Sequence, residues 1–295
     1  MAVKALAYIT AETAKIDEWK TYATNILGVQ IAEKAPAGTL GLRLDDRPFR
    51  YVLRPGKEER FGAAGLTHAS KKEFDESIQK LERAGVRVEK GSAADAKAMF
   101  VEELVRCSDP AGNKLELVWG CAETFELFLS PQGVTGFLTG EMGLGHVVFP
   151  SNKVKETHDF YQDLLGFGDS DEARLFMSPN PEDPPVSITF MHANNPRHHT
   201  VAFGNVPAPT GLIHTMLEAK TIDDVGRAYD RALNAGVKIA ASLGRHVNDH
   251  MLSFYMQSPS GWVVEFGCMG TQFDWSTFTP TISHKDSHWG HRWGG

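Results

Sequence analysis

The feature that most constrains this chain is an internal repeat, because copies of one unit must occupy equivalent places in a fold. The segment AYITAETAKIDEWKTYATNILGV, starting at Ala7, matches GHVVFPSNKVKETHDFYQDLLGF, starting at Gly145. Each copy begins as a short apolar strand, crosses a polar turn, continues as an amphipathic helix and ends on Leu-Gly. In this alignment Tyr8 falls opposite His146.

A second unit repeats in the same order. The segments GLTHASKKEFDESIQKLERAGVRV and GLIHTMLEAKTIDDVGRAYDRALNAGVKI align through their Gly-Leu-x-His openings, with a few extra residues before the helix in the later copy. This alignment places His68 opposite His214. The closing segments DPAGNKLELVWG and SPSGWVVEFG share a Pro-x-Gly turn and a strand, with Glu116 opposite Glu265. Each half is therefore expected to be a pair of strand–helix–strands modules, which is an α+β fold.

The segment FLSPQGVTGFLTGEMG, residues 128–143, is rich in glycine and proline and is expected to link the two halves. We place an N-terminal domain at residues 1–133 and a C-terminal domain at 134–280. Residues 281–295 lack periodicity and are rich in His, Trp and Gly, so they are expected to form a tail, ordered only against a neighbour or the mouth of a site.

Composition narrows the function to small-molecule chemistry. The net charge of -7 and the absence of a long basic cluster argue against a nucleic-acid partner. No apolar run is long enough for a membrane span, and the first residues do not form a signal peptide. The three cysteines are too few and too scattered for a disulfide framework or a thiolate metal site. A cytoplasmic protein is expected.

Glu265 lies inside the apolar strand WVVEF, where an unpaired carboxylate is costly. His146 in GHVVF and His214 in GLIHTML lie on other strands of the same half. If these strands are neighbours in one curved sheet, the three side chains meet on its concave face. Two histidines and a carboxylate suit non-haem Fe(II), although ligand type leaves Zn, Mn, Ni and Mg open. Taken singly, each histidine is more often a core residue. Recurrence at repeat-equivalent places favours a metal site.

The first half carries Tyr8 in place of one histidine but keeps His68 and Glu116. A copy with two ligands would hold a metal weakly. We therefore expect this half to be a structural partner without a site, in which His68 and Glu116 are satisfied by hydrogen bonds or water.

The stretch GRHVNDHMLSFYMQSPSGWVVEFG, residues 244–267, resembles the signature of the type I extradiol ring-cleavage dioxygenases, with Ser258 in place of the usual acidic or amide residue. With GLGHVVF, PRHHTVAF and GLIHTML, the resemblance covers nearly the whole chain and is greatest to the 2,3-dihydroxybiphenyl 1,2-dioxygenases and their naphthalenediol and trihydroxybiphenyl counterparts. It implies paired βαβββ modules of the vicinal oxygen chelate superfamily, with iron bound only by the C-terminal domain.

The resemblance also implies residue roles. The implied Fe(II) ligands are His146, His214 and Glu265. The implied catalytic residues are His199, as the acid–base group beside dioxygen, and His246 and Tyr255, as hydrogen-bonding partners of the substrate oxygens. Asn248 and Asp249 are implied to shape the pocket. An apolar lining is expected from Val148, Phe190, Phe203 and Pro280, and it would favour an aryl substituent on the substrate.

The expected reaction is extradiol cleavage of a bicyclic catechol, such as 2,3-dihydroxybiphenyl, with O2 as co-substrate and a ring-opened hydroxy-oxo-dienoate as product. Dihydroxynaphthalene and trihydroxybiphenyl are alternative substrates. Two other classes share the implied fold: glyoxalase-type metal-dependent isomerases, which have no need of His199, His246 and Tyr255 together, and metal-free proteins that sequester drugs, which lose the ligand positions. Open curved sheets are also compatible with a homo-oligomer.

Overall fold

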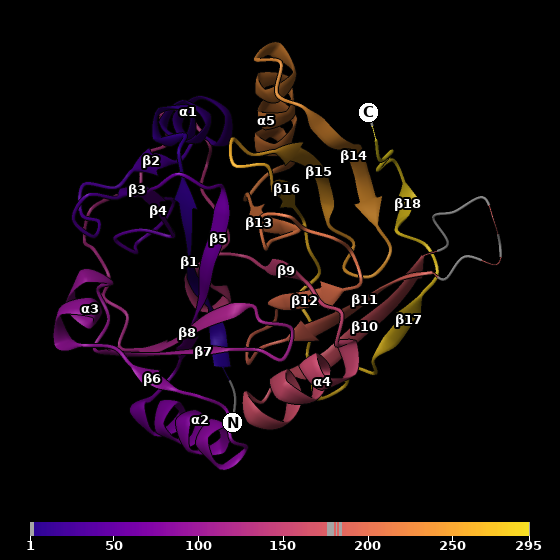
Figure 1. Ribbon diagram of the computed structural model, residues 1–295. Helices are drawn as coiled ribbons and strands as arrows, with labels where there is room; N and C mark the ends of the chain where they lie inside the picture. The colour runs from indigo at the N-terminus through magenta and orange to yellow at the C-terminus, as the bar shows by residue number, and fades with distance from the viewer. Residues whose placement is uncertain (1–2, 176–179, 181, 183–184, 295) are drawn as a thin grey trace.

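The computed structural model describes residues 3–175, 180, 182 and 185–294, whose strands form two curled sheets with helices on their outer faces (Figure 1). The first sheet comes from the N-terminal half and the second from the C-terminal half. None of the helices described is long and apolar enough to cross a membrane.

The N-terminal half contains, in chain order, β1 (Val3–Thr13), α1 (Ile16–Thr21), the π-helix η1 (Tyr22–Leu27), β2 (Gln30–Ile31), β3 (Leu40–Arg43), β4 (Tyr51–Pro55), β5 (Arg60–His68), α2 (Lys71–Arg83), β6 (Glu89–Lys90), α3 (Ala93–Ala98), β7 (Glu103–Ser108) and β8 (Lys114–Trp119). Its described strands are ordered β2-β3-β4-β1-β5-β8-β7-β6.

The C-terminal half contains η2 (Gly140–Met142), β9 (Val147–Pro150), α4 (Val154–Asp159), the π-helix η3 (Phe160–Leu164), β10 (Gly168–Leu175), β11 (Val186–His192), β12 (Val201–Gly204), β13 (His214–Glu218), α5 (Ile222–Asn234), β14 (Ile239–His246), β15 (Leu252–Gln257), β16 (Val263–Cys268), β17 (Thr281–Ser283) and β18 (Ser287–Trp289). Its described strands are ordered β17-β10-β11-β12-β9-β13-β16-β15-β14-β18.

Apart from β17 and β18, the two sheets have the same topology. In each, two βαβββ modules meet through their first strands, which are β1 and β5 in one sheet and β9 and β13 in the other. Alternating apolar residues face the helices, and serine or threonine N-caps start the long helices: Ser70 accepts from Glu73 N and Thr221 from Asp224 N. The α+β fold of strand–helix–strands modules predicted from the repeat is confirmed, as are the paired βαβββ modules that the resemblance implies.

The predicted alignment of His68 with His214 is wrong. Strand register instead makes Ala63 the counterpart of His214, because Ala63 pairs with Thr10 as His214 pairs with Val148. His68 corresponds to Ala219, and the offset of 151 (219 − 68) also relates the helix caps Ser70 and Thr221 (221 − 70). The later copy therefore has no extra residues before its helix, and the shared Gly-Leu-x-His letters are fortuitous.

The described part of the predicted tail, residues 281–294, is built into the C-terminal sheet. β17 pairs with β10 and β18 pairs with β14, so this segment adds a strand to each edge of the C-terminal sheet. Figure 1 shows it, in yellow, running between the two edges. Its order comes from backbone pairing with distant strands, which the local sequence does not reveal.

Candidate metal centre and substrate cavity

Adjacent strands of the C-terminal sheet carry the predicted site residues. The strands β12-β9-β13-β16-β15-β14 are consecutive neighbours in this sheet. Each carries one site residue, either on the strand or within two residues of its end. The contributing side chains are, in that order of strands, His199, His146, His214, Glu265, Tyr255 and His246. All of them line one cavity on the concave face of the sheet.

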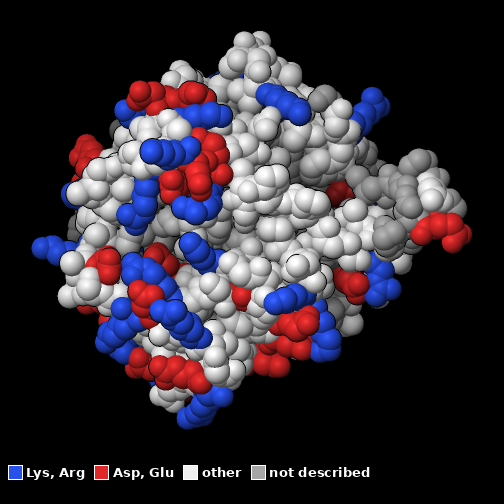
Figure 2. Space-filling model, in the orientation of Figure 1, with Lys and Arg blue, Asp and Glu red and all other residues white. Residues whose placement is uncertain are grey.

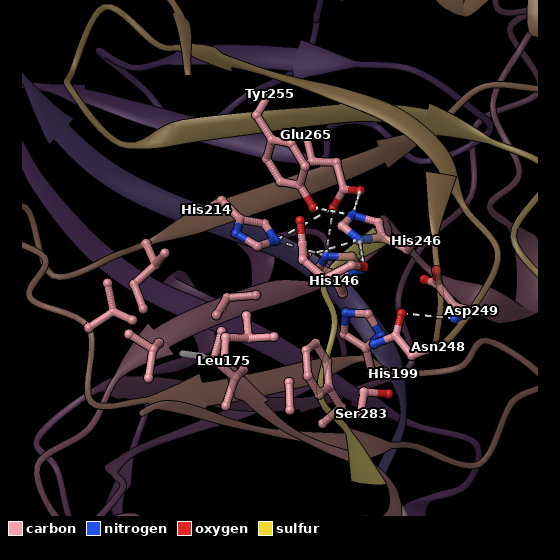
Figure 3. A pocket seen from close by; sticks show the side chains of 18 of the residues that line it. His146, Leu175, His199, His214, His246, Asn248, Asp249, Tyr255, Glu265 and Ser283 are labelled. Carbon is pink, nitrogen blue, oxygen red and sulfur yellow. Dashed lines mark hydrogen bonds and ion pairs between the residues drawn. The ribbon is translucent and has the colours of Figure 1, made fainter. Parts of the chain in front are cut away.

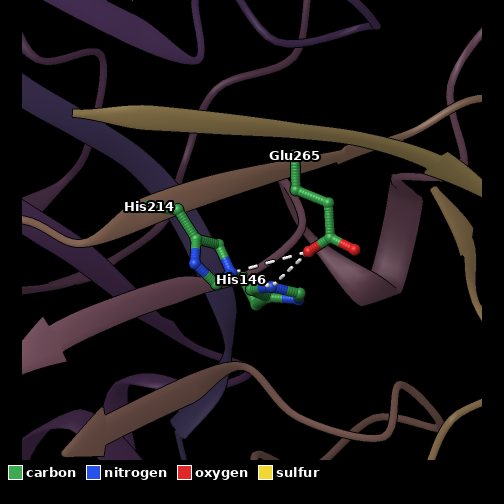
Figure 4. Close-up of side chains that lie close together, drawn as sticks. All are labelled: His146, His214 and Glu265. Carbon is green, nitrogen blue, oxygen red and sulfur yellow. Dashed lines mark hydrogen bonds and ion pairs between the residues drawn. The ribbon is translucent and has the colours of Figure 1, made fainter. Parts of the chain in front are cut away.

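His146, His214 and Glu265 converge to a single point (Figure 4). The two Nε2 atoms are 3.1 Å apart, and Glu265 Oε2 lies 3.2 Å from His146 Nε2 and 3.5 Å from His214 Nε2. Ligands bonded at about 2.1 Å and at right angles to one another lie about 3 Å apart, so this triangle fits one shared metal ion. The prediction that these three residues meet is confirmed.

Gly145 explains how His146 reaches this point. Its φ of +148° is open only to glycine, and a Cβ there would collide with the carbonyl oxygen of Met216 on β13. The absence of a side chain lets the backbone approach β13 closely, where Met216 N donates to His146 O at 3.0 Å. The Gly-His pair of GLGHVVF therefore fixes the ligand against its neighbouring strand.

Burial sets the protonation of the triangle. It lowers the pKa of His146 to about 4, so this imidazole is neutral near pH 7 and can bind a metal. Burial opposes ionisation of Glu265, but hydrogen bonds to His146, His214 and His246 outweigh it and hold the pKa of this carboxyl well below its usual range. Two imidazole nitrogens and one carboxylate are the donor set of the facial-triad iron sites. The residues present fit a divalent metal.

His199 lies beside the triangle. Its ring centroid is 3.9 Å from that of His146 and 4.9 Å from that of Phe190, and its Nδ1 is 3.0 Å from Nδ1 of His198. Burial holds the pKa of His199 well below its usual value, so the ring is neutral near pH 7. A neutral imidazole in this position can accept a proton and later return it.

His246 and Tyr255 form a pair on the other side of the triangle. His246 Nε2 lies 2.7 Å from the Tyr255 hydroxyl and 3.5 Å from Glu265 Oε1. Its Nδ1 lies 3.1 Å from the backbone oxygen of Asp286 and 3.4 Å from the Asp286 carboxylate. Burial opposes protonation of His246, but Asp286 and Glu265 raise its pKa well above the usual value. The pair therefore presents a positive ring and a hydroxyl beside the triangle.

The cavity has a volume of about 310 Å³ and two unlike walls (Figure 3). One wall carries the triangle, His199, His246 and Tyr255, with Asn248 and Asp249 at its side. The opposite wall is apolar and is formed by Ala173, Leu175, Val186, Ile188, Phe190 and Val206, while Val148 and Ile213 line the cavity beside the triangle, since Val148 pairs with His214. Val148, Phe190, Asn248 and Asp249 thus line the cavity, as predicted.

Phe203 and Pro280 do not line it. Register places Phe203 beside Phe149 and Ala202 beside Val148, so Phe203 faces the helices and stacks on Tyr161 with ring centroids 5.7 Å apart. Pro280 is exposed just before β17, and Ser283 lines the cavity from that strand instead. The period-two alternation of β12 excludes Phe203 from the concave face once Ala202 lies on it.

Sequence reasoning missed Asp286 and Trp293, which line the cavity from the C-terminal segment. Trp293 Nε1 donates to Asp286 Oδ2 at 3.0 Å, and the sequence around them gives no periodic signal. Val186 and Ile188 were also missed. Their signal was present, because they share a face of β11 with Phe190 at a spacing of two.

Comparison with known proteins agrees with this site. The Glyoxalase/Bleomycin resistance protein/Dioxygenase superfamily matches residues 143–266, and the dihydroxybiphenyl dioxygenase BphC D1 family matches residues 6–56. An iron-dependent extradiol dioxygenase of Rhodococcus jostii (strain RHA1) is 39% identical over 99% of this chain and 97% of its own length. The chain belongs to the extradiol dioxygenases.

Other members of this family resemble it over the same length. A biphenyl-2,3-diol 1,2-dioxygenase of Metapseudomonas furukawaii is 37% identical over 99% of this chain and 94% of its own. The crystal structure of BphC, a halotolerant catechol dioxygenase, superimposes with a TM-score of 0.91 at 32% identity, over 99% of this chain and 95% of that one. Membership makes the protein an oxidoreductase and supports its use of iron and dioxygen.

Proposed function

We propose that this extradiol dioxygenase opens the ring of a bicyclic catechol, with 2,3-dihydroxybiphenyl as the representative substrate. One observation carries the proposal: the two-histidine, one-carboxylate triangle opens directly onto a cavity whose far wall is apolar. A diol placed at the triangle puts the rest of the substrate against that wall. A second, uncharged ring gains free energy there, whereas a charged substituent loses it.

In this proposal His146, His214 and Glu265 hold Fe(II). Bound there, the iron would supply Lewis acidity toward the hydroxyls of the diol and the redox chemistry that lets the diol react with dioxygen. The ferrous state suits the donor set and the need for an electron-rich ion that reacts with dioxygen.

His246 and Tyr255 orient the diol. The cationic ring of His246 and the Tyr255 hydroxyl lie together beside Glu265, so they favour a negative charge on the substrate oxygen next to them. One oxygen of the diol is then ionised and the other keeps its proton. Asp286 acts as a positioning residue, since it contacts His246 Nδ1 and fixes the ring with Nε2 toward the cavity.

His199 moves the second proton. Its neutral ring accepts the proton of the remaining hydroxyl and returns it to the oxygen atom that must leave when the O–O bond breaks. Asn248 and Asp249 shape the loop beside it: Asn248 Oδ1 accepts from Asp249 N at 2.8 Å, and Asp249 Oδ1 accepts from Met251 N at 2.9 Å. The product is a ring-opened hydroxy-oxo-dienoate.

The test is anaerobic reconstitution with ferrous iron, followed by 2,3-dihydroxybiphenyl and then air, with oxygen uptake and a yellow product as readouts. We expect both signals, their loss in His146→Ala, and a higher kcat/KM for 2,3-dihydroxybiphenyl than for catechol. A preference for catechol would contradict the bicyclic substrate. Turnover of a thiol adduct without oxygen uptake would instead support a glyoxalase-type isomerase.

1,2-Dihydroxynaphthalene and 2,2',3-trihydroxybiphenyl belong in the same assay, because proteins named for these substrates resemble this chain at 35% and 30% identity. Their relative kcat/KM values rank the three diols. The expected homo-oligomer and the cytoplasmic location stay predictions.

A further inference from the structure

The N-terminal sheet holds a cavity in the place that corresponds to the substrate cavity. The cavity has a volume of about 580 Å³ and lies on the concave face of the sheet. Strand register makes Thr10 the counterpart of Val148, and Ala63 the counterpart of His214. Both Thr10 and Ala63 line this second cavity. The repeat has therefore kept the concavity while changing what lines it.

The carboxylate of this cavity is neutralised from within the protein. Glu116, the counterpart of Glu265, accepts from the Tyr8 hydroxyl at 2.7 Å and from Arg106 Nε at 3.1 Å. Arg106 is the register counterpart of Tyr255, since each pairs across the sheet with the glutamate. Because the negative charge of Glu116 is already paired with Arg106, no bound cation is needed to neutralise it.

Three further basic residues around the cavity are unpaired. The exposed side chains of Arg54, Arg87 and Lys114 line it and form no hydrogen bond or ion pair with any other described residue. Of the two acidic residues in the lining, Glu116 is paired with Arg106 and only Glu89 remains. The free charges therefore sum to a positive cavity, which attracts anions.

The apolar part of the cavity lining is small. Of Ala63, Val86, Cys107 and Leu115, only Val86 is partly exposed, and strand alternation turns the side chains of Cys107 and Leu115 away from the face that carries Arg106 and Glu116. Figure 2 shows basic and acidic side chains crowded over the N-terminal half, whereas the C-terminal half is largely uncharged in this view. Ala63 and the aliphatic stems of Arg54, Arg87 and Lys114 are the apolar surface that the cavity offers to the body of an organic anion.

We propose that the N-terminal cavity is a second binding site, which takes an organic carboxylate: the carboxylate pairs with Arg54, Arg87 and Lys114, and the body of the ligand packs against Ala63 and the aliphatic stems of these basic side chains. A guanidinium presents paired donors that match a carboxylate. The ring-opened product of the proposed reaction belongs to this chemical class, and that one link rests on the proposed function. The site itself does not.

The test is calorimetric titration of the full-length, metal-free protein with benzoate, with the uncharged isostere benzamide beside it. We expect benzoate to bind, more weakly as salt rises, and benzamide not to bind. In the double variant Arg54→Gln/Lys114→Gln we expect the affinity for benzoate to fall about tenfold or more. The matched pair Lys72→Gln/Arg83→Gln, on exposed positions of α2, should bind as the parent does.

Two results would overturn the proposal. One is no binding of benzoate by the parent protein. The other is binding that survives in Arg54→Gln/Lys114→Gln but is lost in Val148→Trp, which fills the substrate cavity, because benzoate would then occupy the C-terminal half. Since the titration measures binding without iron or catechol, its failure is separate from a failure of ring cleavage.

Discussion

Glu116 and Glu265 occupy the same register position in the two sheets, yet they meet opposite surroundings. Glu116 is paired with a tyrosine hydroxyl and an arginine, at 2.7 and 3.1 Å. Glu265 lies 3.2 and 3.5 Å from the Nε2 atoms of His146 and His214, and 3.5 Å from Nε2 of a third imidazole, His246. The carboxylate of Glu116 is thus satisfied by protein side chains, whereas in the proposed function the carboxylate of Glu265 binds the metal. The neighbouring side chains make this difference.

Removing each carboxylate in turn tests whether the two glutamates have different roles, and it has the largest expected effect. Glu265→Ala should lose iron, and its activity should fall by more than about 100-fold, since even residues that only support a metal ligand account for 10–100-fold. Glu116→Ala should keep iron and activity but lower the free energy of unfolding by about 1–3 kcal/mol, because Tyr8 and Arg106 lose their acceptor. Metal analysis, oxygen uptake and urea unfolding measure these effects. Equal iron loss in both variants would remove the distinction.

The second prediction concerns the strands that only the C-terminal sheet possesses. Asp286→Asn should retain iron but lower kcat/KM about 10–100-fold, because His246 loses the carboxylate that orients it. The same loss lowers the pKa of His246, so the limb of the kcat/KM profile that depends on protonated His246 should move to lower pH. Asp274→Asn, an exposed aspartate of the same C-terminal region, is the control and should match the parent. An unmoved pH profile would argue against a role through His246.

A third experiment gives the N-terminal half the site residues of the C-terminal half. The triple variant Tyr8→His/Ala63→His/Arg106→Tyr gives the N-terminal sheet the register equivalents of His146, His214 and Tyr255 around Glu116. We expect the bound metal per chain to double, as measured with zinc or ferrous iron. Ala63→His alone should not change it, because Arg106 still occupies the carboxylate. A folded triple variant with unchanged metal content would mean that more than these positions separates the halves.

The smallest expected effect lies at His68. Burial lowers the pKa of His68, which is hydrogen-bonded to Ser77 Oγ at 2.9 Å and near Val118 O at 3.2 Å. Between the folded pKa of His68 and the unfolded pKa of about 6.5, the unfolded chain binds more protons than the folded one. The stability that neutral, hydrogen-bonded His68 contributes is therefore complete above about pH 6.5 and is lost as pH falls toward the folded pKa. The stability difference between the parent and His68→Gln should therefore shrink from pH 7 to pH 5. A constant difference in urea unfolding would contradict it.

Much of the architecture could be predicted because local patterns carry it. The repeat, the Pro-x-Gly turns and the helix ends gave the module order, and the lone glutamate in WVVEF pointed to the triangle. His68 was misplaced because three shared letters, Gly, Leu and His, outweighed register, which depends on pairing with β1 and β8. Its prediction as a hydrogen-bonded residue was confirmed, as was that of Glu116.

The remaining gaps have the same origin. Asp286 lies between two three-residue strands that pair with opposite edges of the sheet, and such short segments carry no periodicity. Phe203 was assigned to the wrong face because a single aromatic residue in a short strand does not reveal which side is concave. Long-range pairing decides both cases.

The C-terminal segment has a consequence for how the enzyme is made. Every other residue of the site precedes Asp286 and Trp293 in the chain, and these two close the cavity only when β17 and β18 have paired with the outer strands. Domains fold in the order in which the ribosome releases them. A nascent chain therefore has its three metal donors before it has the wall that orients His246, and the complete cavity waits for the synthesis of residues 281–294.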